Sequence, residues 1–148
     1  MSDAFSRRAL IEAPEGFARD QHVPFHHVDA AGIVFYGRVF EWFHELYVAF
    51  LADVGFPLPE QLRGGTIAPL AHADADYLSP LRFGDPIRVA MVQSGVTADR
   101  VRLGYRVTGP SGPAVVGSAV HVFVDPRTFQ RTPMPPGLRA AFERLSRP

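Results

Sequence analysis

The most regular hydrophobic pattern in the chain lies between Tyr36 and Val54. Apolar residues recur there at intervals of three and four, which places them along one stripe of an α-helix. Gly55 follows the last of them and Pro57 comes shortly after, a combination typical of a helix end. Trp42 and other apolar residues lie off the stripe. The pattern therefore predicts one long helix that is enclosed by the rest of the fold.

Alternating and β-branched-rich runs predict strands in much of the remaining chain. We expect these strands at residues 17–28, 67–78, 87–92, 101–107 and 114–124. In the second run, small residues alternate with His72, Asp74 and Asp76, which gives the strand one small-residue face and one polar face.

Short connections rich in Gly and Pro separate the later strands, as at 84–86 and 109–113. Consecutive strands joined in this way form an antiparallel sheet. We therefore expect an α+β fold in which a curved, five-stranded antiparallel sheet wraps around one long central helix. A short helix is expected at 138–145, and residues 1–17 predict a loose N-terminal arm.

Length and composition narrow the class of protein. The chain has 148 residues, and neither a linker nor a repeat divides it, so a single domain over 1–148 is expected. Hydrophobic residues make up 47% and the formal net charge is zero, which argues against disorder and against a nucleic-acid partner. Cysteine is absent, which excludes thiol nucleophiles and disulfides. No apolar run is long enough for a membrane span or a secretory signal, so we expect a cytoplasmic protein.

The stretch from Phe25 to Tyr36 carries the candidate chemistry. It places Asp29 at the expected end of a strand, follows it with a small-residue turn that contains Gly32, and leads into the long helix. A helix N-terminus presents unpaired backbone N–H groups that can hold an anion. A carboxylate beside such donors can attack, or activate water to attack, a carbonyl carbon whose oxygen gains negative charge. This arrangement suits acyl transfer from an ester or a thioester.

The same stretch resembles the 4-hydroxybenzoyl-CoA thioesterase family of the hotdog fold. The matching pattern is an aromatic residue, an Asp, two small residues, a Gly, and an Ile-Val-aromatic-Tyr sequence before the helix. The resemblance continues through Phe40-Glu41, Ala75-Asp76-Tyr77, Pro80 and Gly84-Asp85, and covers about residues 18–130.

The resemblance implies a function and roles for particular residues. It implies an acyl-CoA thioesterase that needs no cofactor or metal and acts on an aromatic or a short-to-medium acyl group. Asp29 is the implied nucleophile or general base, the backbone N–H of Tyr36 holds the oxyanion, and Gly32 shapes the turn. It also implies a homodimer or homotetramer in which each active site lies between two subunits.

Other candidate residues follow from the same comparison. Many family members carry an Asp where this chain has His27, and His27 would share a strand face with Asp29 and tune its carboxylate. Phe35 and His44 are expected at the substrate, with His44 in the acyl pocket. Arg100 and Arg102 stand where the family has a basic stretch for CoA, and further candidates for the CoA phosphates are Arg82, Arg88 and Arg127.

Several alternatives stay open. Asp29 could simply cap its turn, and Glu41 on the helix is a rival catalytic carboxylate. A non-catalytic hotdog protein that binds acyl-CoA is a second function, against which the intact motif argues. A hotdog dehydratase or hydratase is a third, against which the absence of Asn argues. The nearby His and Asp residues have no recognised metal-ligand spacing.

Overall fold

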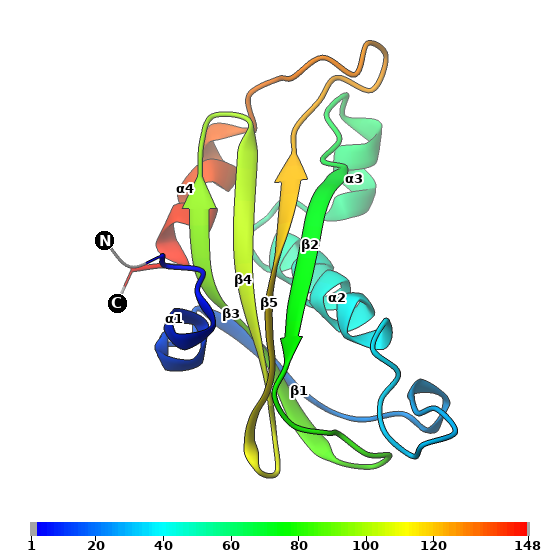
Figure 1. Cartoon of the computed structure of the whole chain (residues 1–148). Coiled ribbons are helices and arrows are strands. Elements are labelled where there is room, and N and C mark those ends of the chain that lie inside the picture. Colours follow the sequence, from blue (N-terminus) through cyan, green and yellow to red (C-terminus); the bar gives the residue numbers. More distant parts are fainter. Residues whose placement is uncertain (1–2, 148) are drawn as a thin grey trace.

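The computed structural model describes residues 3–147. The strands are β1 (Phe17–His22), β2 (Leu70–Tyr77), β3 (Pro86–Val96), β4 (Arg100–Gly109) and β5 (Gly112–Val122). The helices are α1 (Arg7–Glu12), α2 (Arg38–Asp53), α3 (Leu58–Arg63) and α4 (Pro136–Arg144), with a 3₁₀ turn η1 at Phe25–His27. All pairings between strands are antiparallel and form one five-stranded sheet in the order β1-β3-β4-β5-β2 (Figure 1).

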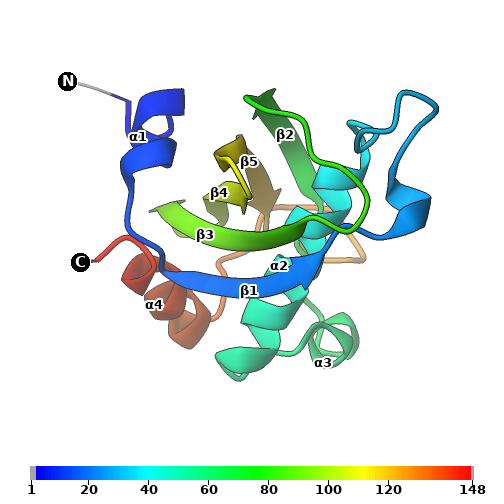
Figure 2. The same cartoon turned by 90° about the horizontal axis from the view of Figure 1, so that it is seen from below.

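The sheet is curved, and the long helix α2 lies on its inner side (Figure 2). Residues of α2 share one buried cluster with inward-facing residues of the strands, because the stripe of the helix and one face of each strand are apolar. Trp42, Leu51 and Tyr105 are among the fully buried members of this cluster. The expectation of a five-stranded antiparallel sheet is confirmed.

Several of the expected boundaries were wrong. The strand expected at 87–92 continues to Val96. The first strand ends at His22 rather than running to residue 28, and Pro24 precedes the 3₁₀ turn η1. Pro24 has no N–H with which to continue the ladder to β3, and it directly precedes the 3₁₀ turn, so the chain leaves the sheet there. The helix begins at Arg38 because residues 35–37 form the turn that leads into it. The short helix α3 was not expected, since its six residues carry no buried stripe.

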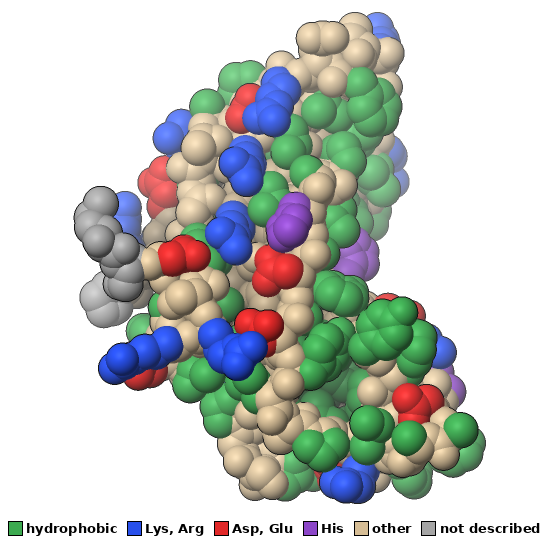
Figure 3. Space-filling view, viewed as in Figure 1, with side chains coloured by type: hydrophobic (Ala, Val, Ile, Leu, Met, Phe, Trp, Pro, Cys, Tyr) green, Lys and Arg blue, Asp and Glu red, His purple; other side chains and the backbone are tan. Residues whose placement is uncertain are grey.

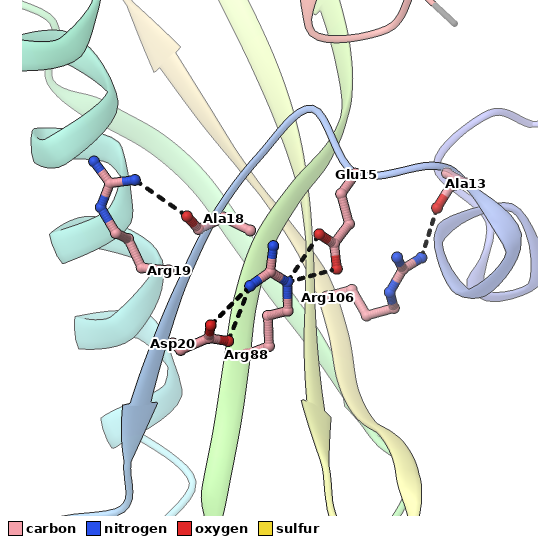
Figure 4. Close-up of polar contacts among 7 residues, drawn as sticks. All are labelled: Ala13, Glu15, Ala18, Arg19, Asp20, Arg88 and Arg106. Carbon is pink, nitrogen blue, oxygen red and sulfur yellow. Dashed lines mark hydrogen bonds and ion pairs between the residues drawn. The ribbon is translucent and has the colours of Figure 1, made fainter.

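The expectation of a loose N-terminal arm over residues 1–17 is corrected for residues 3–17, whereas residues 1 and 2 lie outside the described part of the chain. Ser6 caps α1 by accepting a hydrogen bond from the N–H of Ala9, and Leu10 is 2% exposed. Gly104 on β4 makes room for this contact, because a Cβ there would lie 2.6 Å from a methyl carbon of Leu10. The guanidinium of Arg106 donates hydrogen bonds to three carbonyl oxygens at the end of α1, of which Figure 4 draws the one to Ala13.

The inner face of the sheet is apolar, whereas the outer face is polar except where Leu10 of α1 packs with Ala90, Val92 and Val116. Figure 3 shows basic, acidic and histidine side chains gathered along this face. In β2 the small residue Ala75 packs against the buried cluster, whereas Asp74 accepts hydrogen bonds from Ser118 and His72. The two faces predicted for this strand are thus present. Among the described residues, no helix is both long and apolar enough to cross a membrane.

Candidate active site

A short closed loop carries Asp29. Val28 and Val34 form an isolated β-bridge at its base. Across the loop, the N–H of Asp29 donates to the carbonyl of Ile33 at 2.9 Å, and the N–H of Gly32 donates to the carbonyl of Asp29 at 2.9 Å. Gly32 has φ +80°, a conformation that favours glycine, so the turn requires this residue type. The loop holds Asp29 at an exposed position.

The carboxylate of Asp29 is oriented by its own turn. Its Oδ1 accepts a hydrogen bond of 2.8 Å from the N–H of Ala31. The turn-capping role considered for Asp29 is therefore real. It occupies only one carboxylate oxygen, because Oδ2 has no hydrogen-bond partner within residues 3–147. The same side chain can thus shape the loop and present a free oxygen.

In the turn before α2, the carbonyl oxygens of two consecutive peptide groups accept hydrogen bonds. The carbonyl of Phe35 accepts a hydrogen bond of 3.0 Å from the N–H of Arg38. The carbonyl of Tyr36 accepts one of 2.7 Å from the hydroxyl of Tyr77 on β2. The N–H groups of Tyr36 and Gly37, on these same two peptides, have no acceptor in the described part of the chain. Two fixed and unpaired donors therefore mark the start of a 16-residue helix.

The loop and this turn are joined to each other. The N–H of Phe35 donates to the carbonyl of His27 at 2.9 Å, and the N–H of Val34 donates to the carbonyl of Leu81 at 2.9 Å. The side chains of Phe35 and Tyr36 are exposed. A carboxylate and a pair of free N–H donors thus come from the two ends of one anchored segment. Whether these groups act together in acyl transfer stays a prediction.

His27 lies elsewhere than the sequence analysis expected. Its ring is 6% exposed, and the indole Nε1–H of Trp42 donates to its Nδ1 at 3.0 Å. Because Nδ1 accepts, the ring is neutral with its proton on Nε2. Burial lowers the pKa of His27, and the neighbouring charges of His26 and Arg38 lower it further, against the opposing effect of Glu41. The premise of a shared strand face with Asp29 was wrong, since His27 belongs to η1 and its ring faces α2.

Glu41, the rival carboxylate, is already paired. The Nη1 of Arg38 lies 3.0 Å from one of its carboxylate oxygens and 3.2 Å from the other. Its Oε2 also lies 3.9 Å from Nε2 of His27. Glu41 is therefore held by a cation and a histidine, in contrast to the free oxygen of Asp29.

A pocket of about 380 Å³ opens along α2, beginning in its first turn. It is lined by residues of α2, α3, the start of β2 and the inner face of the sheet, which are Phe40, Phe43, His44, Tyr47, Leu58, Leu62, Ile67, Ala68, Pro69, Leu70, Ala73, Tyr105, Ala119 and His121. His44 lines this pocket and is exposed, whereas Phe35 is not part of the lining. A second pocket, of about 290 Å³, is lined in part by Val34, Val39 and Tyr77.

Two of the expected CoA-binding arginines are engaged in other contacts. Arg102 donates to the hydroxyl of Ser118 at 3.1 Å, and its guanidinium stacks over the ring of Phe5. Arg88 forms bidentate contacts with Glu15 and Asp20, as Figure 4 shows.

The other arginine candidates differ from these two. The side chains of Arg82, Arg100 and Arg127 form no ion pair with any residue between 3 and 147. All three are exposed, so they are the better candidates for phosphate contacts.

Three residues with contacts at the candidate site were not singled out by the sequence analysis. Tyr77 was noted only as part of a motif, yet its hydroxyl holds the Tyr36 carbonyl. Trp42 was read as a core residue, although its indole fixes the tautomer of His27. His121 lies in a β-branched run that gave no polar signal. No cluster of three or more potential metal ligands occurs within the described residues.

Comparisons with known proteins show the family of the chain. The family model of the thioesterase-like superfamily matches residues 23–142. A 1,4-dihydroxy-2-naphthoyl-CoA hydrolase from Synechococcus elongatus is 31% identical over 119 residues, which cover 79% of this chain and 88% of that protein.

Solved structures show the same fold. A 1,4-dihydroxy-2-naphthoyl-CoA thioesterase from Synechocystis matches with a TM-score of 0.82 at 23% identity, covering 89% of this chain and 98% of that one. A gentisyl-coenzyme A thioesterase matches with a TM-score of 0.75 at 24% identity, covering 82% of this chain and 98% of that one. At these identities the two structures speak for the fold alone.

Proposed function

The chain belongs to the thioesterase-like superfamily, and we propose that it hydrolyses an acyl-CoA thioester to the free acid and CoA with Asp29 as its catalytic carboxylate. The observation that carries the proposal is that one short segment bears both a free carboxylate oxygen on Asp29 and the unpaired N–H groups of Tyr36 and Gly37. Both ends of the segment between them are anchored by hydrogen bonds, so the donors and the carboxylate are preorganised.

The proposed reaction uses each part of this geometry. The thioester oxygen lies at the N–H donors and gains negative charge as the carbonyl carbon is attacked. Asp29 either attacks the carbon itself, giving a mixed anhydride that water then cleaves, or takes a proton from an attacking water. In both routes the C–S bond breaks, water supplies the oxygen of the new acid, and the CoA thiolate leaves and takes up a proton.

The acyl group is proposed to occupy the pocket along α2. Phe40, in the first turn of that helix, belongs to the lining, so the pocket begins close to the free N–H groups. Its walls are mainly aromatic and aliphatic, which suits an aromatic or a short-to-medium acyl chain. The name of the curated relative, 1,4-dihydroxy-2-naphthoyl-CoA hydrolase, supports the aromatic choice.

We also propose the hotdog assembly, with the sheet wrapped around α2 and two copies joined along β2. β2 is an edge strand, and such a strand presents unpaired backbone groups that a second copy can use. Both pockets are lined in part by β2 or the residues that flank it. Exposed apolar side chains of Leu70 and Tyr77 lie on the same strand. A dimer formed there would cover these side chains and place the sites between subunits.

A panel of thioesters tests the proposed activity. Purified protein is incubated with aromatic and aliphatic acyl-CoA compounds, thiol release is followed with a thiol-reactive dye, and products are identified by mass spectrometry. A thioesterase releases CoA and the free acid. A hydratase or dehydratase would alter the acyl group without releasing thiol, and a binding protein would bind the thioester without turnover; either result would overturn the proposal.

A further inference from the structure

His121 is a buried histidine that the proposed acyl-transfer step does not use. Its side chain is 6% exposed, and its Nδ1 lies 3.0 Å from the carbonyl oxygen of Ala68. Since a carbonyl oxygen can only accept, Nδ1 carries a proton. Burial lowers the pKa of His121 against the opposing effect of this hydrogen bond, and His44 lowers it further. The ring is therefore neutral near pH 7, and Nε2 carries a lone pair.

The lone pair of Nε2 faces open space. Nε2 has no hydrogen-bond partner among residues 3–147. Among these described residues, every side-chain nitrogen or oxygen atom that is fully buried has a hydrogen-bond partner, so an atom without a partner is not fully buried. Nε2 is consequently an accessible atom of an otherwise buried side chain. Since His121 lines the pocket along α2, the pocket is the space that Nε2 reaches.

The surroundings of this acceptor suit a flat ring. His121 stacks on Tyr47 with ring centres 4.2 Å apart, and Phe43 stacks on Tyr105 at 4.5 Å, each pair within 10° of parallel. All four residues line the pocket. Burial raises the pKa of Tyr47 and of Tyr105, so both hydroxyls stay protonated. The pocket is thus apolar and aromatic, with a few polar atoms at defined places.

We propose that His121 is a specificity residue, whose Nε2 accepts a hydrogen bond from a hydroxyl on the aromatic ring of the acyl group. This inference rests on the proposed function, because it assigns the pocket to the acyl part of the thioester. A ring without the hydroxyl would displace water from Nε2 and leave this nitrogen without a hydrogen-bond partner. The transition state would then be bound less tightly. The enzyme therefore prefers hydroxylated aryl thioesters to their unsubstituted parents.

The test compares matched pairs of substrates. For the wild type, kcat/KM is measured for benzoyl-CoA against its 3-hydroxy and 4-hydroxy derivatives, and for 2-naphthoyl-CoA against 1,4-dihydroxy-2-naphthoyl-CoA. We expect at least one hydroxylated substrate to exceed its parent by about tenfold, the value of one well-placed hydrogen bond in a dry site. Ratios near one for every pair would overturn the inference.

Three variants test whether the preference for hydroxylated substrates depends on His121. His121→Phe keeps a flat ring against Tyr47 but has no acceptor, so the preferred ratio should fall towards one while the parent is still hydrolysed. His121→Gln places an amide near the position of Nε2 and should restore part of the preference. His44→Phe changes the other histidine of the pocket and should affect both members of a pair alike. A ratio kept in His121→Phe, or lost only in His44→Phe, would contradict the assignment.

Folding and function are separated by two further readouts. Circular dichroism and thermal melting show whether each variant folds. If His121→Phe does not fold, the role of His121 is tested by the kcat/KM ratio of the wild type and by the change of that ratio in His121→Gln. If no thioester is hydrolysed, the proposed function fails. If hydrolysis depends on Asp29 but ignores the hydroxyl, only the role of His121 fails.

Discussion

The hydroxyl of Tyr77 on β2 donates a hydrogen bond of 2.7 Å to the backbone carbonyl of Tyr36, at the turn that leads into α2. This bond fixes the peptide whose other end is the unpaired N–H of Gly37. Burial raises the pKa of Tyr77, and this keeps its hydroxyl a donor over the working pH range. A strand on one edge of the sheet thus positions part of the proposed oxyanion site.

Tyr77→Phe should therefore lower kcat more than it raises KM. The variant keeps the ring but frees the peptide, and one neutral hydrogen bond is worth about 0.5–1.5 kcal/mol, or roughly twofold to tenfold in rate. Steady-state kinetics with the best thioester gives the two constants. Tyr36→Phe is the matched control, because the hydroxyl of Tyr36 has no partner within residues 3–147, and it should cost less. Equal losses in both variants would show that the bond has no catalytic part.

The neutral histidine His27 predicts a pH dependence of stability. An unfolded chain protonates a histidine near pH 6.5, whereas burial lowers the pKa of His27 in the folded protein. The unfolded state thus binds more protons below about pH 6.5, and the free energy of unfolding should fall as the pH drops through the lower, folded pKa. Protonation of Nδ1 would also break the bond from Trp42.

The measurement is urea denaturation at several pH values between about 7.5 and 5, across the range in which histidine titrates. His27→Gln should show a shallower decline than the wild type, and His121→Gln should do the same, because burial also lowers the pKa of His121. An unchanged slope in His27→Gln would contradict the account of this residue.

The hydrogen bonds of Arg106 should stabilise the N-terminal segment on the sheet. Its guanidinium donates to the carbonyls of Leu10, Ile11 and Ala13 at 3.0, 2.9 and 2.7 Å. Arg106→Met keeps most of the aliphatic stem but removes these bonds, and should lower the free energy of unfolding by about 1–3 kcal/mol. Chemical denaturation measures the loss, and limited proteolysis should cut the segment around α1 first.

Arg139→Met is the matched control for that change. Arg139 forms an exposed pair with Glu143 on α4 at 3.1 Å, and such pairs contribute only about 0.3–0.5 kcal/mol. An equal effect of the two variants would mean that α1 does not depend on Arg106.

The open edge of β2 predicts self-association. Light scattering at micromolar concentration should give at least twice the chain mass of 16.3 kDa. A stable monomer would refute the assembly, although the fold itself would stand.

How much could be predicted from the sequence differed between the elements. The apolar stripe of α2 and the alternation in β2 are strong signals, so these elements were predicted close to their true positions. α1 has only Leu10 as a buried residue, and its position depends on Arg106, which is distant in the sequence. Periodicity cannot reveal a helix that a remote side chain holds in place.

The candidate site divides in the same way. The segment from Asp29 to Tyr36 could be located from the sequence, because its turn and the following helix start are local features. The roles of Trp42, Tyr77 and His121 depend on contacts between distant parts of the chain. The interpretation of His27 failed because an assumed strand ended early, and a change of secondary structure redirects every side chain that follows it.

The central claim is that Asp29, and not Glu41, is the catalytic carboxylate, and the kinetics of Asp29→Asn test it most directly. Asn retains an Oδ1 that can accept from the N–H of Ala31, so the loop should keep its shape while charge and basicity are lost. We predict a fall in kcat of roughly 10²–10⁴-fold with KM little changed, and for Glu41→Gln a loss of less than about tenfold. Near wild-type turnover in Asp29→Asn together with an inactive Glu41→Gln would contradict the account and move the catalytic carboxylate to the helix.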